Sequence, residues 1–590
     1  MGPDTIAIGG ASGFWGDSAL GATQLVAHGK IDFLVFDYLA ELTMSLLASA
    51  RAKNPQLGYA TDFVSVAMRA VLKDALEKNM RIVANAGGVN PQACAAALKA
   101  LADELGLSVK IAVIDGDDVM ALLPSLRQEH VAKPYSGEPI PANILSANAY
   151  LGALPIKQAL DAGAQVVITG RCVDSAVTLG ALLHCFDWSM DDYDKLAAAS
   201  LAGHIIECGC QGVGGLHTDW EAVPDWAHSG YPIVECSRDG GIVVTKPPGT
   251  GGLVTPATVG EQLLYEIGDP ARYILPDVIC DFTAVDLQQL GPDRVAVRGA
   301  RGLAPTTSYK VSATYADGYR CATQLTIVGI EAERKARRTA DAIIERTGEM
   351  LAQRGMAPFS AVHIEVLGSA AAFGPQLPRA PLYEAVLWLA VAHPDKAALA
   401  LFAREIAAAG TSWSPGTTGA AGRPGVVPAI KQYAFLLDKE RVQARYAIDG
   451  GTPVAVAVPR GAPSPDEPAA LSGPLLIAQD EAIEVPLIAL AYARSGDKGD
   501  TSNIGVIARD PAHLPLLRAQ LSEERVAAWL AHWVKGPVKR YELPGIHAFN
   551  FVCQQALGGG GMASLRHDPL GKGMAQLLLA MPIRVAPTLS

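Results

Sequence analysis

The sequence predicts an α/β fold, a mostly parallel doubly wound sheet, followed by α+β segments and a small α+β domain at the C-terminus. Three observations support this prediction. The first half alternates short Val/Ile-rich runs with helix-like segments, the pattern changes after about residue 240, and a proline-rich stretch precedes the last hundred residues. Continuous apolar strands that alternate with helices are typical of parallel strands buried on both faces. An open doubly wound sheet is favoured, and a barrel is the alternative.

The first half contains ten predicted elements between residues 5 and 185. Pro91 stands at the first turn of one helix, where its missing N–H has no intrahelical partner to lose. The predicted strands cover 5–10, 31–36, 81–85, 109–114 and 165–169, and the predicted helices cover 17–28, 40–50, 64–78, 91–105 and 175–185.

The second half reads as α+β. Runs at 241–245, 294–297 and 309–315 alternate apolar and polar residues, which is typical of half-buried strands. A long helix over 330–353 leads to a strand over 362–366. The stretch 462–468 is rich in proline and reads as a linker. The predicted divisions are therefore 1–240, 241–460, a linker over 461–483, and 484–590.

The last division is predicted to be an independent α+β domain of ferredoxin-like size. Its predicted strands at 485–492 and 504–508 flank a long loop, and predicted helices cover 522–534 and 570–580. The loop begins Ala493-Arg-Ser-Gly-Asp-Lys-Gly-Asp500, and ordinary hairpins need only two to five residues. Long polar loops between rigid strands are where binding groups concentrate, although a self-bonded loop neutralised by Lys498 is also consistent with the sequence.

Composition excludes several classes of protein. The chain has 590 residues, is 50% hydrophobic and 18% charged, and carries a formal net charge of -11. The size suggests roughly three to five folding units. No Lys/Arg block is long enough to follow a nucleic-acid backbone, and no apolar run of about 18 residues predicts a membrane span.

No signal peptide is evident, and nine scattered cysteines fit a cytoplasmic protein with reduced thiols. Alanine-rich apolar helices favour a homo-oligomer.

Five predicted strands end in polar, glycine-rich loops. In a parallel sheet these loops meet at one edge, where ligands bind. Each alone also suits a structural role: the acidic run 115–118 as a cap, and Arg171 with Asp174 as an ion pair. The glycine-rich loop after the first strand lacks the spacing of a dinucleotide fingerprint. The loops are Gly9-Gly-Ala-Ser-Gly-Phe-Trp-Gly-Asp17, Asp37-Tyr-Leu-Ala-Glu41, Asn85-Ala-Gly-Gly-Val-Asn90, Asp115-Gly-Asp-Asp118 and Gly170-Arg-Cys-Val-Asp-Ser175.

Two further segments carry chemistry. His204 and Glu207 share a helix face at i, i+3, a spacing that suits proton transfer, a metal, or a satisfied buried histidine. Lys246 and Thr250 stand in a glycine-rich loop able to face an anion, or to let two segments pass closely. The candidate catalytic residues are Asp17, Asp174, His204, Glu207 and Asp497. The candidate substrate- or anion-binding residues are Ser12, Gly13, Asn85, Gly87, Arg171, Lys246, Thr250, Arg494, Ser495, Lys498 and Asn503.

These motifs together resemble the acyclic terpene utilization (AtuA) family, with its large domain fused to its small ferredoxin-fold domain. The resemblance covers nearly the whole chain and rests on motifs in the same order. They include the loops at 9–17, 85–88 and 169–175, Glu207-Cys-Gly209, Lys246-Pro-Pro-Gly-Thr-Gly-Gly252, Arg494-Ser-Gly-Asp-Lys-Gly-Asp500, Asn550-Phe551, Leu557-Gly-Gly-Gly560, Ser564-Leu-Arg566 and Gly571-Lys572.

The resemblance implies a role in bacterial breakdown of citronellol- and geraniol-type acids through branched acyl-CoA thioesters. It favours a lyase, either a hydratase or a C–C lyase, on a branched-chain acyl-CoA or related carboxylic acid. The alternatives are a non-catalytic subunit that partners an acyl-CoA carboxylase or dehydrogenase, and a nucleotide-using enzyme. No cofactor or metal is firmly implied, and a CoA thioester enters only as a substrate. Arg494 and Lys498 are expected to complete an anion-binding site between the domains.

Overall fold

A large open sheet forms the core of the protein. The structure is a computed structural model that describes residues 4–134, 136–368, 370–378, 380–420, 422–463, 483–561 and 563–586. The sheet has eleven strands in the order β11-β12-β8-β7-β1-β2-β3-β6-β4-β19-β20. The five neighbouring strands β1, β2, β3, β6 and β4 are parallel to one another. These are β1 (Thr5–Gly10), β2 (Phe33–Phe36), β3 (Arg81–Ala84), β6 (Val166–Thr169) and β4 (Ile111–Asp115).

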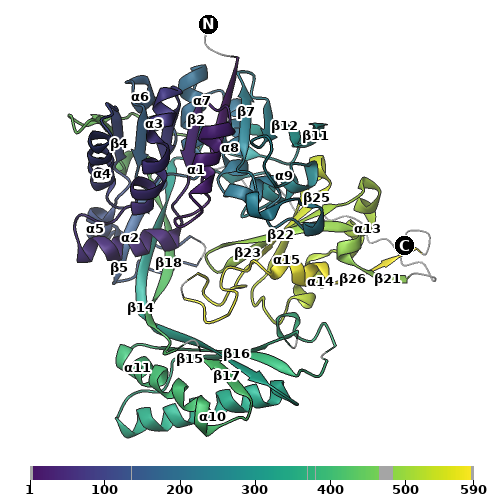
Figure 1. The fold of residues 1–590 in the computed structure, drawn as a ribbon. Helices are drawn as coiled ribbons and strands as arrows, with labels where there is room; N and C mark the ends of the chain where they lie inside the picture. Colours follow the sequence, from purple (N-terminus) through teal and green to yellow (C-terminus); the bar gives the residue numbers. More distant parts are fainter. Residues whose placement is uncertain are drawn as a thin grey trace.

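Helices cover both faces of this sheet, which confirms the α/β class and the doubly wound arrangement. One face packs on the first four helices and the other on the next group, and each face has its own apolar core (Figure 1). The first group is α1 (Leu20–His28), α2 (Glu41–Lys53), α3 (Arg69–Glu77, continued from the π-helical turn Phe63–Met68) and α4 (Pro91–Glu104). The second is α5 (Leu123–Gln128), α6 (Leu154–Asp161), α7 (Ala176–Phe186), α8 (Tyr193–Ile206) and α9 (Pro256–Leu263).

Antiparallel strands extend the parallel core at both ends. β7 pairs with β1 and β8 pairs with β7, so the predicted division at residue 240 falls between two strands of one sheet. At the other end β19 pairs with β4. The added strands are β7 (Ile233–Ser237), β8 (Ile242–Thr245), β11 (Asp286–Gly291), β12 (Arg294–Arg298), β19 (Arg445–Ile448) and β20 (Val454–Ala455). A small separate sheet holds β9 (Tyr273–Ile274), β10 (Ile279–Asp281) and β13 (Arg301–Leu303).

A second lobe is organised by one long strand, β14 (Ser308–Val328). Its first half pairs with β5 and β18, next to the large domain, and its second half pairs with β16 and β17 in the lobe. The strand prediction over 309–315 therefore captured only its beginning. The lobe contains β15 (Ala361–Leu367), β16 (Glu384–His393), β17 (Thr417–Ala420), α10 (Ala332–Gln353), α11 (Lys396–Glu405) and α12 (Ala409–Ser412), and β5 (Ile144–Ala149) and β18 (Val426–Asp438) join it to the large domain.

The C-terminal domain has a four-stranded antiparallel sheet in the order β22-β23-β25-β24. β25 lies between β23 and β24, which two helices connect, so this part forms the split β-α-β unit of ferredoxin-like folds. The elements are β21 (Ile483–Pro486), β22 (Ala491–Lys498), β23 (Thr501–Ala508), α13 (Leu514–Gln520), α14 (Glu523–Trp529), β24 (Val538–Leu543), β25 (Ala548–Cys553), α15 (Met574–Leu579) and β26 (Pro582–Val585). Residues 464–482 of the predicted linker lie outside the described residues.

The long loop predicted over 493–503 is wrong. Arg494 to Lys498 belong to β22, Thr501 opens β23, and only Gly499 and Asp500 form the turn, with Gly499 at φ +69°. The sequence pattern did not reveal these strand ends because several of their polar side chains, including those of Arg494 and Asn503, are buried against another domain instead of exposed to water. Asn503, for example, is buried and bonded to the large domain.

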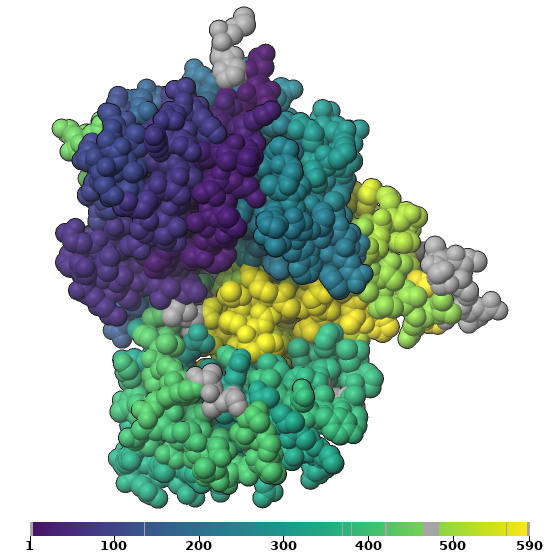
Figure 2. All heavy atoms as spheres, in the orientation of Figure 1, coloured from purple at the N-terminus to yellow at the C-terminus, as the bar shows by residue number. Residues whose placement is uncertain are grey.

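The C-terminal domain fills the space between the large domain and the lobe. Figure 2 shows the chain's last segment, in yellow, between the purple and teal domain above and the green lobe below. In Figure 1 β1 runs from the N-terminus toward the edge of the sheet that faces β22 and β23. The strand ends that the sequence marks as polar therefore face the second domain. No helix in the described part of the chain is both long and apolar enough for a membrane crossing.

Candidate functional site

The ends of the parallel strands bring buried polar groups together. Asp37 follows β2 and is only 8% exposed. Its carboxylate accepts hydrogen bonds from the Asn85 amide and, at 3.3 Å, from the Leu39 N–H, while Ser12 Oγ donates to its backbone carbonyl at 3.1 Å. Asn85 Oδ1 in turn accepts from the Tyr38 N–H at 2.7 Å. The loops after β1, β2 and β3 thus hold one another in place.

Gly87 is required where the loop after β3 crosses the end of β6. Its N–H donates to the Thr169 carbonyl at 3.0 Å, and a Cβ at this position would lie 2.5 Å from that oxygen. A side chain would therefore separate the two loops. Gly87 shapes the edge through its backbone.

Arg171 and Asp174 follow β6. Arg171 is 3% exposed, and its guanidinium donates to Asp174 Oδ1 at 2.7 Å and lies over the Tyr150 ring at 4.1 Å. Its backbone N–H donates to the buried Asp117 carboxylate at 2.9 Å. Burial alone would lower the pKa of Arg171, but Asp174 and further acidic groups outweigh it and raise that pKa well above its usual value. Arg171 is therefore a fixed cation in the cluster.

His204 and Glu207 form a pair at the end of α8. His204 Nδ1 lies 3.0 Å from Glu207 Oε1, and Nε2 lies 3.1 Å from the Leu263 carbonyl oxygen. Because a carbonyl only accepts, Nε2 carries a hydrogen, so Nδ1 and Glu207 share the remaining proton. Burial lowers the pKa of His204, but Glu207 outweighs it and the pKa is raised; burial also raises the pKa of Glu207. The pair therefore retains a proton more readily than either isolated group.

Lys498 reaches the strand ends from the second domain. Its ammonium pairs with Glu266 at 3.1 Å, and it lies close enough to Glu41 and Asp174 for their charges to raise its pKa against the effect of burial. The effect is mutual, because Lys310, Lys498 and Arg171 overcome burial and lower the pKa of Glu41. Tyr150 also donates to Glu41 at 2.7 Å. We call Asp37, Glu41, Arg171, Asp174, Glu207 and Lys498 the strand-end cluster.

The carboxylates of this cluster differ in how they hold protons. Burial, and then the charges of Asp174 and Glu207, raise the pKa of Asp37 well above its usual value. Glu41 stays ionised because cations surround it. Pairs of carboxyl groups whose environments separate their pKa values are the usual arrangement of acid–base sites. The cluster therefore combines proton-holding carboxyls with an ionised one and two fixed cations.

Asp497 lies beside the cluster and is paired with Lys572. Lys572 Nζ is 3.1 Å from Asp497 Oδ1 and 3.1 Å from Glu266 Oε1, and it also donates to the Tyr265 hydroxyl. Burial, with the charge of Glu266, raises the pKa of Asp497 to about 6 despite Lys572. Burial acts on Glu266 in the same direction, but Lys498 and Lys572 lower its pKa to about 2.

Arg494 lies in a different, fully buried network. Its guanidinium donates to Gln211 Oε1 at 2.6 Å, to the Gly215 carbonyl at 2.9 Å and to Glu261 Oε2 at 3.1 Å. Glu261 is 0% exposed and also accepts from Thr218. Arg494 therefore holds the two domains together, and its contacts are with this network rather than with the strand-end cluster.

Two other candidates on β22 and β23 also bond within or between domains. Asn503 Nδ2 donates to the Leu264 carbonyl at 2.7 Å and to Asn550, and its Oδ1 accepts the Glu266 N–H at 2.9 Å. Ser495 Oγ donates to the Gly571 carbonyl at 2.7 Å. These contacts align β22 and β23 with the segment that follows α9.

The remaining candidates have local partners. Asp17 accepts from the Gly13 N–H at 2.9 Å and from the Tyr231 hydroxyl at 3.1 Å, which closes the loop after β1. Lys246 pairs with Asp293 at 3.1 Å and donates to the Thr250 carbonyl at 2.7 Å. The structure thus brings Asp37, Arg171, Asp174, Glu207 and Lys498 together and gives Asp17 and Lys246 local bonds.

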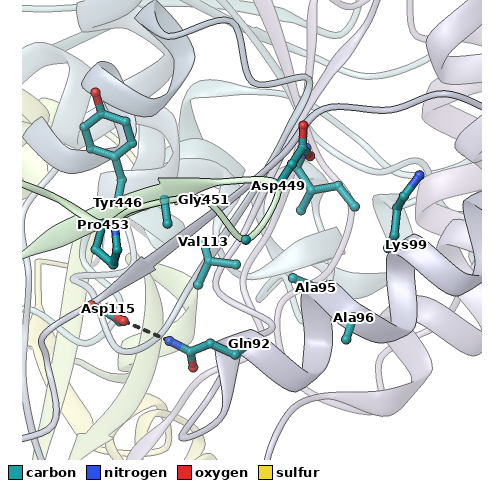
Figure 3. A pocket seen from close by; sticks show the side chains of 13 residues that line it. Gln92, Ala95, Ala96, Lys99, Val113, Asp115, Tyr446, Asp449, Gly451 and Pro453 are labelled. Atoms are coloured by element: carbon teal, nitrogen blue, oxygen red, sulfur yellow. Dashed lines mark hydrogen bonds between the residues drawn. The ribbon is translucent and has the colours of Figure 1, made fainter.

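A cavity of about 380 Å³ lies apart from the cluster, between α4 and the β19–β20 hairpin (Figure 3). Its floor is apolar, with Ala95, Ala96 and Val113. Its charged groups serve local bonds: Asp115 accepts from Gln92 at 2.8 Å and pairs with Arg445, and Lys99 pairs with Asp103. The charged groups suited to catalysis therefore lie in the strand-end cluster rather than in this cavity.

Two family models cover most of the chain. The acyclic terpene utilisation family protein AtuA matches residues 6–448, and the AtuA ferredoxin-like domain matches residues 485–584. The chain belongs to the acyclic terpene utilisation (AtuA) family. Family membership gives it a role in acyclic terpene utilisation and confirms the fused architecture expected from the motifs. A comparison with curated proteins finds no match.

In this AtuA-family chain, sequence reasoning missed several partners of the cluster. Tyr150 directly follows β5 and Lys310 lies on β14, and no local pattern reveals that these strands lie beside the strand ends. Glu266 follows α9 without a recognisable motif, although Lys572 stands in the Gly571-Lys572 motif. The loop after β2 did identify Asp37 and Glu41 from the sequence, but it did not identify the cations around Glu41. The sequence therefore predicts which residues follow the parallel strands, but it does not predict which cations surround them.

Proposed function

We propose that the protein is a lyase, a hydratase or a C–C lyase, that acts on a branched-chain acyl-CoA or a related carboxylic acid at the strand-end cluster. The observation that carries this proposal is the position of Lys498. It comes from the C-terminal domain and stands among the carboxylates of the large domain. A site that needs both AtuA-family domains is consistent with their fusion in one chain.

Glu207 and His204 are suited to move a proton. Addition of water to an enoyl thioester, and cleavage of a hydroxyacyl thioester, both require a group that takes a proton from oxygen. Because Glu207 shares a proton with His204, the Glu207 carboxyl can both accept a proton and donate one. His204 is 1% exposed and acts as the positioning residue. Glu41, which is ionised, and the neighbouring Asp174 carboxyl bind or orient the reacting hydroxyl.

Arg171 and Lys498 are suited to hold negative charge. Both reactions develop negative charge on the thioester or carboxylate oxygen, and cations held close to that oxygen stabilise the charge. Arg171 is held by Asp174 and Tyr150, so it needs little reorganisation. Lys498 is 45% exposed, so its ammonium remains accessible to a ligand.

The test is a panel of branched enoyl-CoA and hydroxyacyl-CoA thioesters, assayed for water addition and for acetate release. We expect turnover by the wild type and a loss of about 10²- to 10⁴-fold in kcat for Glu207→Gln. Lys498→Met should lower kcat/KM for the same thioester. A matched control is Lys195→Met, which removes a lysine of α8 that pairs with Asp192.

Absence of turnover across the whole panel would overturn the proposal. Co-purification with an acyl-CoA carboxylase or dehydrogenase, together with that absence, would instead support a non-catalytic subunit. Unchanged kcat for Glu207→Gln would place the reaction elsewhere in the molecule.

A further inference from the structure

A second cavity, of about 570 Å³, lies between the large domain and the C-terminal domain. Its volume is in the range that holds small-molecule ligands. Its walls come from the segment 210–229 of the large domain and from β22 and α15 of the other domain. None of the six residues of the strand-end cluster lines this cavity, although Lys572 of the cavity and Lys498 of the cluster both pair with Glu266.

One wall of the cavity is apolar and exposed. Trp220 and Trp226 are 56% and 61% exposed, and their rings meet edge to face at 5.9 Å. Leu216 is 70% exposed and adopts φ +60°, a left-handed conformation that costs a leucine roughly 1–2 kcal/mol. Large apolar side chains gathered at one cavity mark a binding surface for an apolar ligand.

The opposite wall is basic. Lys572, Arg494 and His217 line it, and no carboxylate is among the described residues that line the cavity. The acids that pair with Arg494 and Lys572 are Glu261, Glu266 and Asp497, and none of the three lines the cavity. The cavity therefore presents an apolar side and a cationic side to one ligand.

His217 is oriented so that one ring nitrogen is available. Nδ1 lies 2.9 Å from Glu261 Oε2, and the ring stacks on Tyr492 at 5.5 Å. His217 and Arg494 overcome the effect of burial and lower the pKa of Glu261, so this carboxylate is ionised and only accepts. Nδ1 therefore carries the hydrogen, and Nε2 is directed away from Glu261. His217 lines the cavity and is 6% exposed.

We propose that this cavity binds an aliphatic carboxylate. The chain lies against Leu216, Trp220 and Trp226. The carboxylate binds together with one proton taken up from water, which lies between a carboxylate oxygen and His217 Nε2, and the positive charge of Lys572 attracts the carboxylate. This site goes beyond the lyase activity proposed above and does not depend on it.

The test is isothermal titration of the full chain with three probes: decanoate, 1-decanol and acetate. Decanoate should bind with one site per chain. 1-Decanol, which keeps the chain but lacks the charge, should bind at least tenfold more weakly, and acetate should give no measurable heat. Equal affinity for decanoate and 1-decanol, or no binding of decanoate, would overturn the proposal.

Three variants locate the ligand. His217→Asn keeps an N–H for Glu261 and removes Nε2, so decanoate affinity should fall about tenfold while 1-decanol affinity does not change. Lys572→Met should weaken decanoate in the same selective way. Trp226→Ala should weaken both probes. The control Trp413→Phe alters a tryptophan of the lobe, packed on Arg346, and should change neither.

A further variant separates this site from the strand-end cluster. Asp174→Asn should leave the Kd of decanoate unchanged even if it removes thioester turnover. Weaker decanoate binding in Asp174→Asn, with no effect of His217→Asn or Trp226→Ala, would show that the ligand occupies the cluster and would refute a separate site.

Discussion

Arg494 and Lys498 stand four residues apart on β22, yet they belong to two very different environments. Side chains at even spacing share a strand face, so both point to the segment around α9. Gly496 lies between them, and a Cβ there would lie 2.5 Å from Glu266 Cγ, so the strand packs closely on this segment. Arg494 is 5% exposed in a matched network, whereas the Lys498 side chain is 45% exposed among the strand-end carboxylates. One strand face thus holds the domains together at one end and places a partly exposed ammonium group at the other.

Arg494→Met should have the largest effect on stability. It leaves the Glu261 carboxylate, 0% exposed, without its cation, and breaking a buried pair in this way costs about 3–5 kcal/mol. The midpoint of urea unfolding should fall accordingly.

The control for Arg494→Met is Arg509→Met. Arg509 pairs with Asp219 at 2.6 Å across the same interface, but these side chains are 23% and 37% exposed. It should cost about 1 kcal/mol or less. A similar small loss for both variants would mean that the buried network does not hold the domains together.

Asn503→Ala should be the next most damaging change. It leaves the Leu264 carbonyl and the Glu266 N–H without their side-chain partner, at about 1–3 kcal/mol. Hydrogen exchange of residues 264–268 should become faster. Asn503→Asp keeps the acceptor for the Glu266 N–H and should lose less; an equal loss in both variants would assign the whole effect to the donor.

The large domain was predictable because its strand signal is local. Apolar runs such as Val166–Thr169, followed by polar loops, identified the parallel strands and the edge at which Asp37, Arg171 and Asp174 meet. The ends of β22 and β23 were not predictable. Arg494 and Asn503 are polar residues that are buried only because the other domain supplies Glu261 and the Leu264 carbonyl. Sequence periodicity reports exposure to water, and it fails where a partner domain replaces water.

Asp497 and Glu266 share Lys572 and should respond to pH in opposite directions. The pKa of Asp497 is about 6 in the folded protein, above the ordinary aspartate value of 3.8, so its stability contribution is complete below pH 3.8 and is lost as pH rises through 6. Asp497→Asn should therefore be more stable than the wild type by about 3 kcal/mol at pH 8 and equal to it at pH 3.5.

Glu266→Gln is the opposite case in the same test. The pKa of Glu266 is about 2 in the folded protein, so its contribution is present above pH 4.5 and is lost as pH falls through 2. This variant should be less stable than the wild type at pH 8. Thermal unfolding of the three proteins from pH 3.5 to 8 measures both effects, and parallel curves for the two variants would contradict the pairing with Lys572.

Lys498→Met should have the smallest effect on stability. Its pair with Glu266 is 45% and 23% exposed, so its removal should cost less than about 1 kcal/mol because solvent screens the pair. The same substitution removes the cation that lowers the pKa of Glu41, so a new titration should appear when Glu41 is followed by carboxyl NMR. Arg494→Met should leave the Glu41 titration unchanged in whatever fraction remains folded. If Lys498→Met destabilises the protein as much as Arg494→Met does, both residues serve to hold the two domains together. The contrast between the two ends of β22 would then be refuted.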